Sequence, residues 1–281
     1  MSVPPSRPRV LLTGASGDVG TRLRPLLAQA YGPIRLSDRA EPRTALVDGE
    51  TFVRADLADP AQCAAIVEGI DAIVHLGGYS VEGPWDAILQ SNIVGLHALY
   101  EAARVAGVKR IVFASSNHAV GFYRRARTID HAVPVRPDTR YGLSKAFGEA
   151  LGALYADKHG LRVLNLRIGN VGDAPIDRRR LAIWITPSDL MQLIRIGIEH
   201  PDLRYEIVYG MSDNAPHAWW DNRRAIELGY RPSGRSADHA AAVLAREERA
   251  DPVADRFQGG TFCAQEYDHP EPGASGVGNL G

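Results

Sequence analysis

A glycine-rich stretch near the N-terminus constrains the fold more than any other part of the chain. The apolar run of residues 10–12 leads into Gly14, Gly17 and Gly20, and a segment of helical character follows over residues 21–30. A short, fully apolar run is typical of a strand buried on both faces of a parallel sheet. Glycines at G-x-x-G-x-x-G spacing let the backbone approach a pyrophosphate, and the next helix offers free N–H groups at its N-terminus. The stretch therefore predicts a strand, a phosphate-binding turn and a helix, with a glycine turn in some other α/β protein as the alternative.

The rest of the chain alternates strand-like and helix-like segments, as a doubly wound parallel sheet requires. We expect strands at 34–37, 51–53, 72–76, 111–114, 163–167 and 205–209, and helices at 60–67, 84–106 and 141–159. A further helix should start at residue 186, and another should end at residue 228. The predicted fold is an α/β, doubly wound (Rossmann) parallel sheet with a small C-terminal substrate-binding lobe. Its expected parts are a flexible N-terminus (1–8), a nucleotide-binding core that includes the catalytic helix (9–167), the remaining strands and the lobe (168–265), and a disordered tail (266–281).

Composition excludes several classes of protein. The 281 residues are 45% hydrophobic and carry a formal net charge of −1, so no basic field favours nucleic acid or an anionic membrane as a partner. Cys63 and Cys263 stand far apart, which predicts neither a disulfide framework nor a metal cluster. Residues 1–8 lack the apolar region of a signal peptide. We expect a cytoplasmic protein that binds no metal and forms a homo-oligomer of a size that the sequence does not fix.

An acidic residue follows the second predicted strand, where it can select the cofactor. Asp38 stands about 20 residues after the glycine turn, where a carboxylate can hold the ribose 2′-hydroxyl of NAD. The same carboxylate would repel the 2′-phosphate of NADP. Arg39 could instead bind that phosphate, but the sequence favours NAD.

Other strand ends supply further candidate cofactor contacts. Asp56 could bind the adenine amino group or begin the next helix, and Gly77 and Gly78 permit close approach of a cofactor. Asn92 lies inside a predicted helix, where it is either solvated or makes a specific polar contact. His75 is expected to be a packed strand residue. The predicted cofactor contacts are Gly14, Gly17, Asp18, Val19, Gly20, Asp38, Asp56, Leu57, Leu76, Gly77, Gly78, Asn92, Ser115, Tyr141 and Lys145.

A serine, a tyrosine and a lysine form the predicted catalytic group. Ser116 lies in the polar cluster that follows the strand at 111–114, and a long loop over 119–139 separates it from Tyr141 and Lys145. Positions four apart share one helix face, so the lysine ammonium can lie below the phenol and lower its pKa. Tyr141 could then exchange a proton with a substrate hydroxyl that Ser116 also binds. With a nicotinamide cofactor, these residues predict a dehydrogenase.

These patterns resemble a known family. The glycine turn with Tyr141 and Lys145 is similar to the extended short-chain dehydrogenase/reductase superfamily. Four stretches, at residues 76–82, 113–118, 219–222 and 256–262, resemble the uronate dehydrogenases within it. The resemblance covers nearly all of residues 9–263 and implies oxidation of the pyranose form of galacturonate or glucuronate at C1 by NAD, which yields an aldarolactone.

The resemblance also implies roles for individual residues. Tyr141 would be the base, Lys145 would modulate its pKa, and Ser116 would orient the hydroxyl. The substrate contacts would be Ser80, Ser116, Asn117, His118, Tyr141, Asn170 and Arg179, the last pairing with the carboxylate. Asn170 departs from the family, which typically carries serine there, and Arg178 and Arg180 leave the choice of arginine open. Trp219 and Trp220 are expected to pack in the core.

Two other functions fit the same patterns. A sugar epimerase or dehydratase of this superfamily would keep its cofactor bound and recycle the hydride, whereas a dehydrogenase forms net NADH. A non-catalytic dinucleotide-binding protein often loses the tyrosine or the lysine, and this chain has both. The sequence therefore favours a dehydrogenase, without choosing between the uronic acids.

Overall fold

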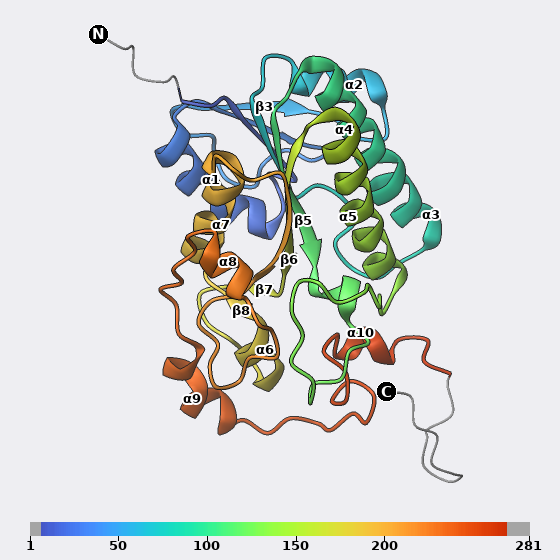
Figure 1. Cartoon of the computed structure of the whole chain (residues 1–281), viewed down its shortest axis with the longest axis vertical. Helices are drawn as coiled ribbons and strands as arrows, with labels where there is room; N and C mark the ends of the chain where they lie inside the picture. The colour runs from blue at the N-terminus through green and yellow to red at the C-terminus, as the bar shows by residue number, and fades with distance from the viewer. Residues whose placement is uncertain (1–6, 269–281) are drawn as a thin grey trace.

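A seven-stranded parallel sheet forms the centre of the computed structural model, which describes residues 7–268 (Figure 1). Its order is β3-β2-β1-β4-β5-β6-β9, and each neighbouring pair is parallel. The strands are β1 (Val10–Thr13), β2 (Ile34–Asp38), β3 (Glu50–Arg54), β4 (Ala72–His75), β5 (Arg110–Ser116), β6 (Arg162–Ile168) and β9 (Tyr205–Gly210). The chain begins in the middle of the sheet and winds outward in both directions, which confirms the predicted doubly wound fold.

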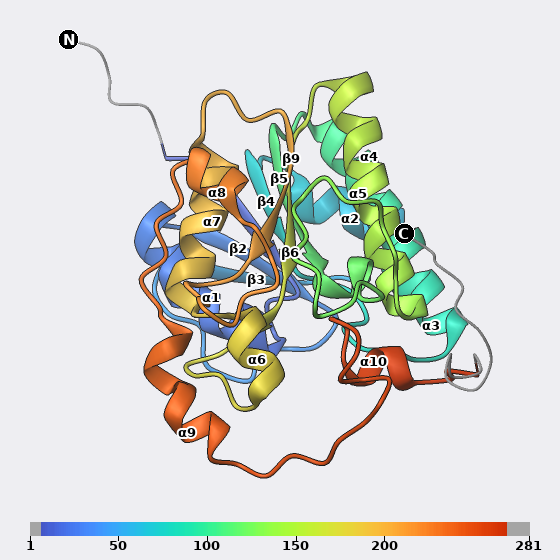
Figure 2. The ribbon, with the colours of Figure 1, turned by 60° about the horizontal axis from the view of Figure 1, so that its bottom comes forward.

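Helices cover both faces of the sheet (Figures 1 and 2). One face packs against α1 (Asp18–Tyr31) and α7 (Pro187–Glu199), and the other against α2 (Pro60–Val67), α4 (Gly95–Ala106) and α5 (Arg140–His159). Successive strand residues point to opposite faces, so Leu12 joins the first apolar layer and Leu11 the second. Both side chains are fully buried, as the apolar run at the start of the chain predicts.

A smaller lobe lies below the end of the sheet where the strands finish (Figure 1). It contains β7 (Asn170–Val171), α6 (Arg178–Ile183), β8 (Trp184–Ile185), α9 (Ala240–Leu244) and α10 (Thr261–Ala264), whereas α8 (Arg223–Glu227) packs on the sheet face beside α7. A third apolar cluster forms there, in which Trp220 stacks on Tyr209 with ring centroids 4.7 Å apart. Residues Arg178–Ile183 form the helix α6, and Asp177 caps its N-terminus by accepting from Arg180 N at 2.8 Å.

The helix predicted over residues 84–106 forms, but it is not α-helical throughout. It consists of α3 (Trp85–Ile88), a π-helical turn over Leu89–Val94, and α4. Asn92, in the π turn, accepts from Tyr79 N at 2.7 Å and donates to Tyr79 O and Ser144 Oγ, each at 2.9 Å. Of the two roles open to Asn92, the structure shows the specific polar contact, and π turns often mark such sites.

Smaller differences from prediction occur at element ends. Helix α1 begins at Asp18 rather than at residue 21, and the long loop after β5 starts with a 3-10 turn over Asn117–Val120. Most of the predicted tail lies outside the described residues, as do residues 1–6; within the described part, Glu266 pairs with Arg140 at 2.7 Å. None of the helices over residues 7–268 is long and apolar enough to cross a bilayer.

Candidate active site

A cavity of about 240 Å³ lies where β1, β2 and β4 end, beside the start of α1. Gly14 has a φ of +72°, and a Cβ there would lie 2.6 Å from Gly77 N, so only glycine fits between the two strand ends. A Cβ on Gly20 would lie 2.2 Å from Gly14 O. The predicted cofactor contacts that line the cavity are Gly14, Gly17, Asp18, Val19, Gly20, Asp38, Asp56, Leu57, Leu76, Gly77 and Gly78, together with the predicted substrate contact Ser80.

Two carboxylates stand at one end of this cavity. Asp38 accepts from Ser16 N at 3.0 Å and from Arg39 N at 2.7 Å, so backbone groups fix its orientation. The exposed Arg39 lines the same cavity. Asp56 accepts from Ala58 N at 3.0 Å, whereas Asp59 caps α2, so the alternative role of starting the helix belongs to Asp59.

Four predicted cofactor contacts are absent from the described lining of this cavity: Asn92, Ser115, Tyr141 and Lys145. Ser115 donates to Glu149 Oε1 at 2.6 Å, and Glu149 forms a buried pair with Arg167. Because neighbouring strand residues point to opposite faces, Ser115 and Ser116 cannot both face the site. The Ser115 and Asn92 side chains bond to the surrounding protein, and their contact with the cofactor stays a prediction. His75 is a packed strand residue, 2% exposed, with Nδ1 2.7 Å from Thr13 Oγ1.

Tyr141 and Lys145 occupy the first turns of α5, beside the end of β5. Thr139 caps this helix by accepting from Gly142 N at 3.0 Å, and Glu82 accepts from Tyr141 N at 2.9 Å. Lys145 Nζ donates to Ala114 O at 2.8 Å and lies 5.5 Å from the centroid of the Tyr141 ring. The structure therefore brings together the three residues predicted to be catalytic, since Tyr141 also meets the hydroxyl of the buried Ser116.

The expected effect of the lysine on the tyrosine is not present in this state. Burial raises the pKa of Tyr141 to about 12, while the hydrogen bond with Ser116 acts in the lowering direction. Burial also lowers the pKa of Lys145 to about 8. The ammonium binds the Ala114 carbonyl instead of the phenol, so Tyr141 stays protonated until further positive charge approaches it.

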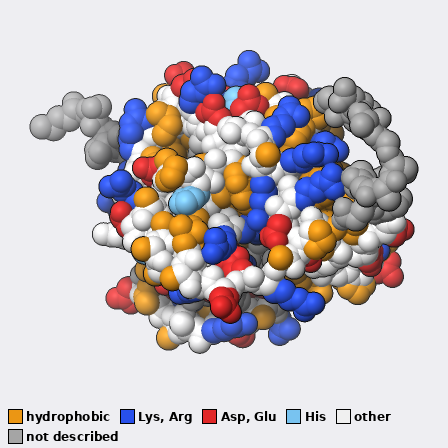
Figure 3. Space-filling view, turned by 90° about the horizontal axis from the view of Figure 1, so that it is seen from below, with side chains coloured by type: hydrophobic (Ala, Val, Ile, Leu, Met, Phe, Trp, Pro, Cys, Tyr) orange, Lys and Arg blue, Asp and Glu red, His pale blue; other side chains and the backbone are white. Residues whose placement is uncertain are grey.

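The three neighbouring arginines have different surroundings. Arg178 donates to Leu244 O at 2.9 Å, and Arg180 pairs with Asp177. Arg179 donates from Nε to Gln258 O at 2.9 Å, and its pKa is lowered to about 10 by burial and by nearby arginines. Among the residues that the structure describes, no carboxylate forms an ion pair with Arg179. Basic, acidic and hydrophobic side chains are interspersed on the surface of the molecule at the end where the smaller lobe lies (Figure 3).

Two strand-end residues lie beside Arg179. With the Asn117 amide oriented to satisfy its neighbours, Oδ1 accepts from Arg179 at 2.8 Å and Nδ2 donates to Ile168 O at 3.2 Å. Asn117 thus holds the guanidinium, although the sequence predicts a sugar contact. His118 Nδ1 lies 2.6 Å from Asp138 Oδ2. Asn170 lies in the short strand β7, which pairs with β8.

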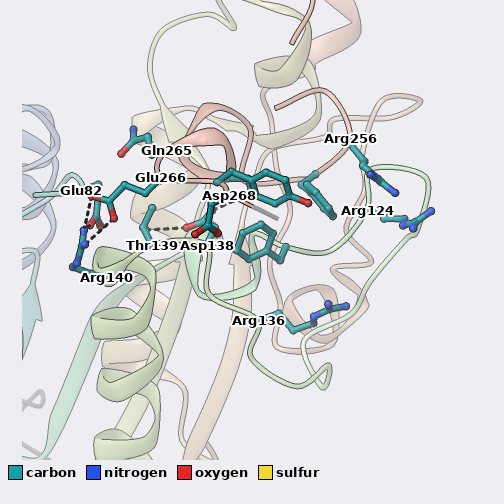
Figure 4. Close-up of a pocket in the computed structure, with 14 residues that line it drawn as sticks. Glu82, Arg124, Arg136, Asp138, Thr139, Arg140, Arg256, Gln265, Glu266 and Asp268 are labelled. Carbon is teal, nitrogen blue, oxygen red and sulfur yellow. Dashed lines mark hydrogen bonds and ion pairs between the residues drawn. The ribbon is translucent and has the colours of Figure 1, made fainter. Parts of the chain in front are cut away.

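Three residues of this region are missing from the predicted site. Glu82 and Asp138 contact the start of α5, and Figure 4 shows Glu82 beside Arg140 and Asp138 beside Thr139. The Phe262 ring stacks on His118 with centroids 3.9 Å apart and lies 6.3 Å from the Tyr141 ring. Glu82 and Phe262 fall in stretches that carry the family resemblance, but no local pattern indicates that either meets the catalytic helix.

Lys145→Met should change how stability depends on pH. The pKa of Lys145 is about 8 in the folded chain against an ordinary value of 10.5, so the unfolded chain binds more protons between these values. The contribution of Lys145 to the free energy of unfolding therefore rises with pH between these two values. The free energy of unfolding of the unmodified protein should rise relative to that of the variant by up to about 3 kcal/mol. Urea unfolding of both proteins across this window measures the difference.

The exposed Lys109→Met variant controls for the loss of one positive charge in that experiment. A difference between the unmodified protein and Lys145→Met that stays constant with pH would contradict a buried ammonium at this position.

Comparison with known proteins gives a consistent result. The sequence profile of the NAD dependent epimerase/dehydratase family matches residues 10–186. The chain is 45% identical over 257 residues to the uronate dehydrogenase of Pseudomonas syringae pv. tomato, covering 91% of this chain and 93% of the relative.

Solved structures agree. The glucuronic acid dehydrogenase of Chromohalobacter salexigens superposes with a TM-score of 0.88 at 44% identity, covering 92% of this chain and 97% of that one. A mutant uronate dehydrogenase of Agrobacterium tumefaciens complexed with NAD gives a TM-score of 0.86 at 41% identity, with the same coverage. The chain therefore belongs to the NAD dependent epimerase/dehydratase family and, within it, to the uronate dehydrogenases.

Proposed function

We propose that this protein oxidises the pyranose form of a free hexuronic acid, galacturonate or glucuronate, at C1 to the aldarolactone, with transfer of the hydride to NAD. The observation that carries this proposal is the Arg179 guanidinium, which has no carboxylate partner among the described residues and lies near His118. A substrate carboxylate would supply the missing charge through a bidentate pair. Uronate dehydrogenases among the relatives support the same substrate class.

The cavity beside α1 suits a dinucleotide. Its glycine turn admits a pyrophosphate against the N–H groups that begin α1, and its carboxylate at Asp38 would accept from a ribose 2′-hydroxyl. When bound, NAD supplies the carbon that accepts the hydride. The charge of Asp38 favours NAD over NADP, although Arg39 lines the same region.

Tyr141 is the proposed base for the anomeric hydroxyl. Ser116 holds the same oxygen, since its hydroxyl already meets the phenol. The phenol releases its proton to solvent and accepts one from the substrate only when its pKa falls well below the value of about 12. Positive charge from Lys145 and from an oxidised nicotinamide ring would lower that pKa. Lys145 keeps the phenol in place through its bond to Ala114 O.

The alternative functions have less support. An epimerase or dehydratase would need no unpaired guanidinium for a free sugar acid, and the chain covers 93% of a uronate dehydrogenase relative. A non-catalytic role would not require Tyr141 to meet the Ser116 hydroxyl. The homo-oligomer and the cytoplasmic location expected from the sequence stay predictions, as does the contact between Asn170 and the sugar.

Tyr141→Phe should lower kcat by about 10² to 10⁴ because it removes the proton acceptor. Binding of NAD should remain nearly intact, because Tyr141 is absent from the lining of the glycine-turn cavity. Tyr155→Phe is the matched control, since Tyr155 lies on the same helix and its hydroxyl bonds to Glu101. Initial rates of NADH formation and titration of NAD binding measure both effects. Near-normal turnover of Tyr141→Phe would refute its role as the base.

Arg179→Ala should lower kcat/KM for galacturonate by roughly ten- to a hundredfold, because a charged hydrogen-bond partner is worth about 1.5 to 3 kcal/mol. It should barely change the low activity on galactose, which lacks the carboxylate. Arg178→Ala is the control, because that arginine is exposed and binds Leu244 O. Rates with both sugars and with a hexose 6-phosphate compare carboxylate, neutral and phosphate substrates. Equal oxidation of galacturonate and galactose by the unmodified enzyme would contradict an acidic-sugar site.

A further inference from the structure

The His118 ring is held on its edge and on its face. Its Nδ1 lies 2.6 Å from Asp138 Oδ2, and the Asp138 side chain is fully buried. The Phe262 ring stacks on one face of the same imidazole, with 3.9 Å between the ring centroids and 19° between the ring planes. The backbone N–H of His118 donates to Ser116 Oγ at 3.2 Å. Such restraints leave the ring little freedom to rotate.

Burial determines the charge of His118. It is the largest influence and lowers the pKa of His118, and the Arg179 charge acts in the same direction. The hydrogen bond and the charge of Asp138 oppose these effects but do not exceed them. The ring is therefore neutral near pH 7 and carries a single N–H. A carboxylate only accepts, so that N–H lies on Nδ1 and points at Asp138.

The chain shapes a pocket for the Asp138 carboxylate. A Cβ on Gly121 or on Gly259 would lie 1.9 Å from Asp138 Oδ2. The other carboxylate oxygen of Asp138, Oδ1, accepts from Thr139 Oγ1 at 3.0 Å (Figure 4). Thr139 in turn caps the N-terminus of α5. Asp138 N also donates to His118 O at 3.2 Å. The carboxylate thus joins the strand-end turn to the start of the catalytic helix.

Asp138 also contacts the helix that carries Phe262. Cys263, the next residue in α10, has its Sγ 3.8 Å from Asp138 Oδ2 and 3.4 Å from Gly121 O. One carboxylate therefore fixes both the edge of the imidazole and the segment that stacks on its face.

We propose that Asp138 is a positioning residue for substrate binding, which holds His118 in the Nδ1–H tautomer so that Nε2 accepts a hydrogen bond from a sugar hydroxyl. This inference rests on the proposed function for the identity of the sugar. His118 Nε2 has no protein hydrogen bond among residues 7–268, and the imidazole and the Tyr141 ring lie 5.8 Å apart. A hydroxyl near the phenol would therefore meet a nitrogen that can only accept.

The tautomer can be measured without any substrate. Nitrogen-15 spectra of the unmodified protein at neutral pH should show His118 as neutral Nδ1–H, with the signal assigned by its loss in His118→Gln. Asp138→Asn should shift the proton toward Nε2, because an amide N–H can donate to Nδ1. A neutral Nε2–H form or an imidazolium in the unmodified protein would overturn the proposal, even if Asp138→Asn failed to fold.

Kinetics separate positioning from general stability. Asp138→Asn should raise KM for the uronate about ten- to a hundredfold with a smaller change in kcat and no change in NAD affinity. In a His118→Ala background the same substitution should change kcat/KM by less than about twofold, because the residue through which it acts is already gone. Independent, multiplicative losses would overturn the proposal. Failure of the proposed substrate would instead leave the tautomer unchanged while no uronate is oxidised.

Discussion

The hydrogen bond from Lys145 Nζ to Ala114 O, at 2.8 Å, joins α5 to β5, and the geometry of the proposed site depends on it. Ala114 precedes Ser116 by two residues on β5, and Lys145 follows Tyr141 by one turn of α5. This bond therefore fixes the phenol relative to the serine hydroxyl. It also keeps an ammonium group buried, with a pKa of about 8, close to the ring of the proposed base.

The N-terminal end of α5 adds a second set of restraints from distant parts of the chain. Glu82 accepts from Tyr141 N, Thr139 caps the helix, and Asp138 binds His118. The loop that holds Ser80 is tied to the same helix through Asn92, which bonds both Tyr79 and Ser144. Cofactor-side and substrate-side elements thus meet at the helix that carries the proposed base.

The sequence predicts local structure well and long-range side-chain contacts poorly. The short apolar runs and the glycine turn at Gly14 predict the sheet and the nucleotide cavity, because both depend on neighbouring residues. The sequence does not predict the π turn at Asn92, and the Tyr79 backbone that Asn92 bonds is brought close only by the fold. Likewise, Asp138 has no local signal, and the partners of Arg178 and Arg179, Leu244 O and Gln258 O, lie in distant segments of the chain. Burial is the largest influence on the pKa of Tyr141 and raises it, so the lowering by Lys145 stays a prediction.

In the proposed reaction a hydride leaves C1 of a free uronic acid and reaches NAD without being returned. Galacturonate carrying deuterium at C1 tests this transfer, with the reduced cofactor analysed by mass spectrometry. We expect one deuterium in each NADH formed, net accumulation of NADH and a slower rate than with the protiated sugar. NADH without deuterium would place the oxidation elsewhere on the sugar, and turnover of the sugar without net NADH would show an enzyme that recycles the hydride; either result would refute the proposed reaction.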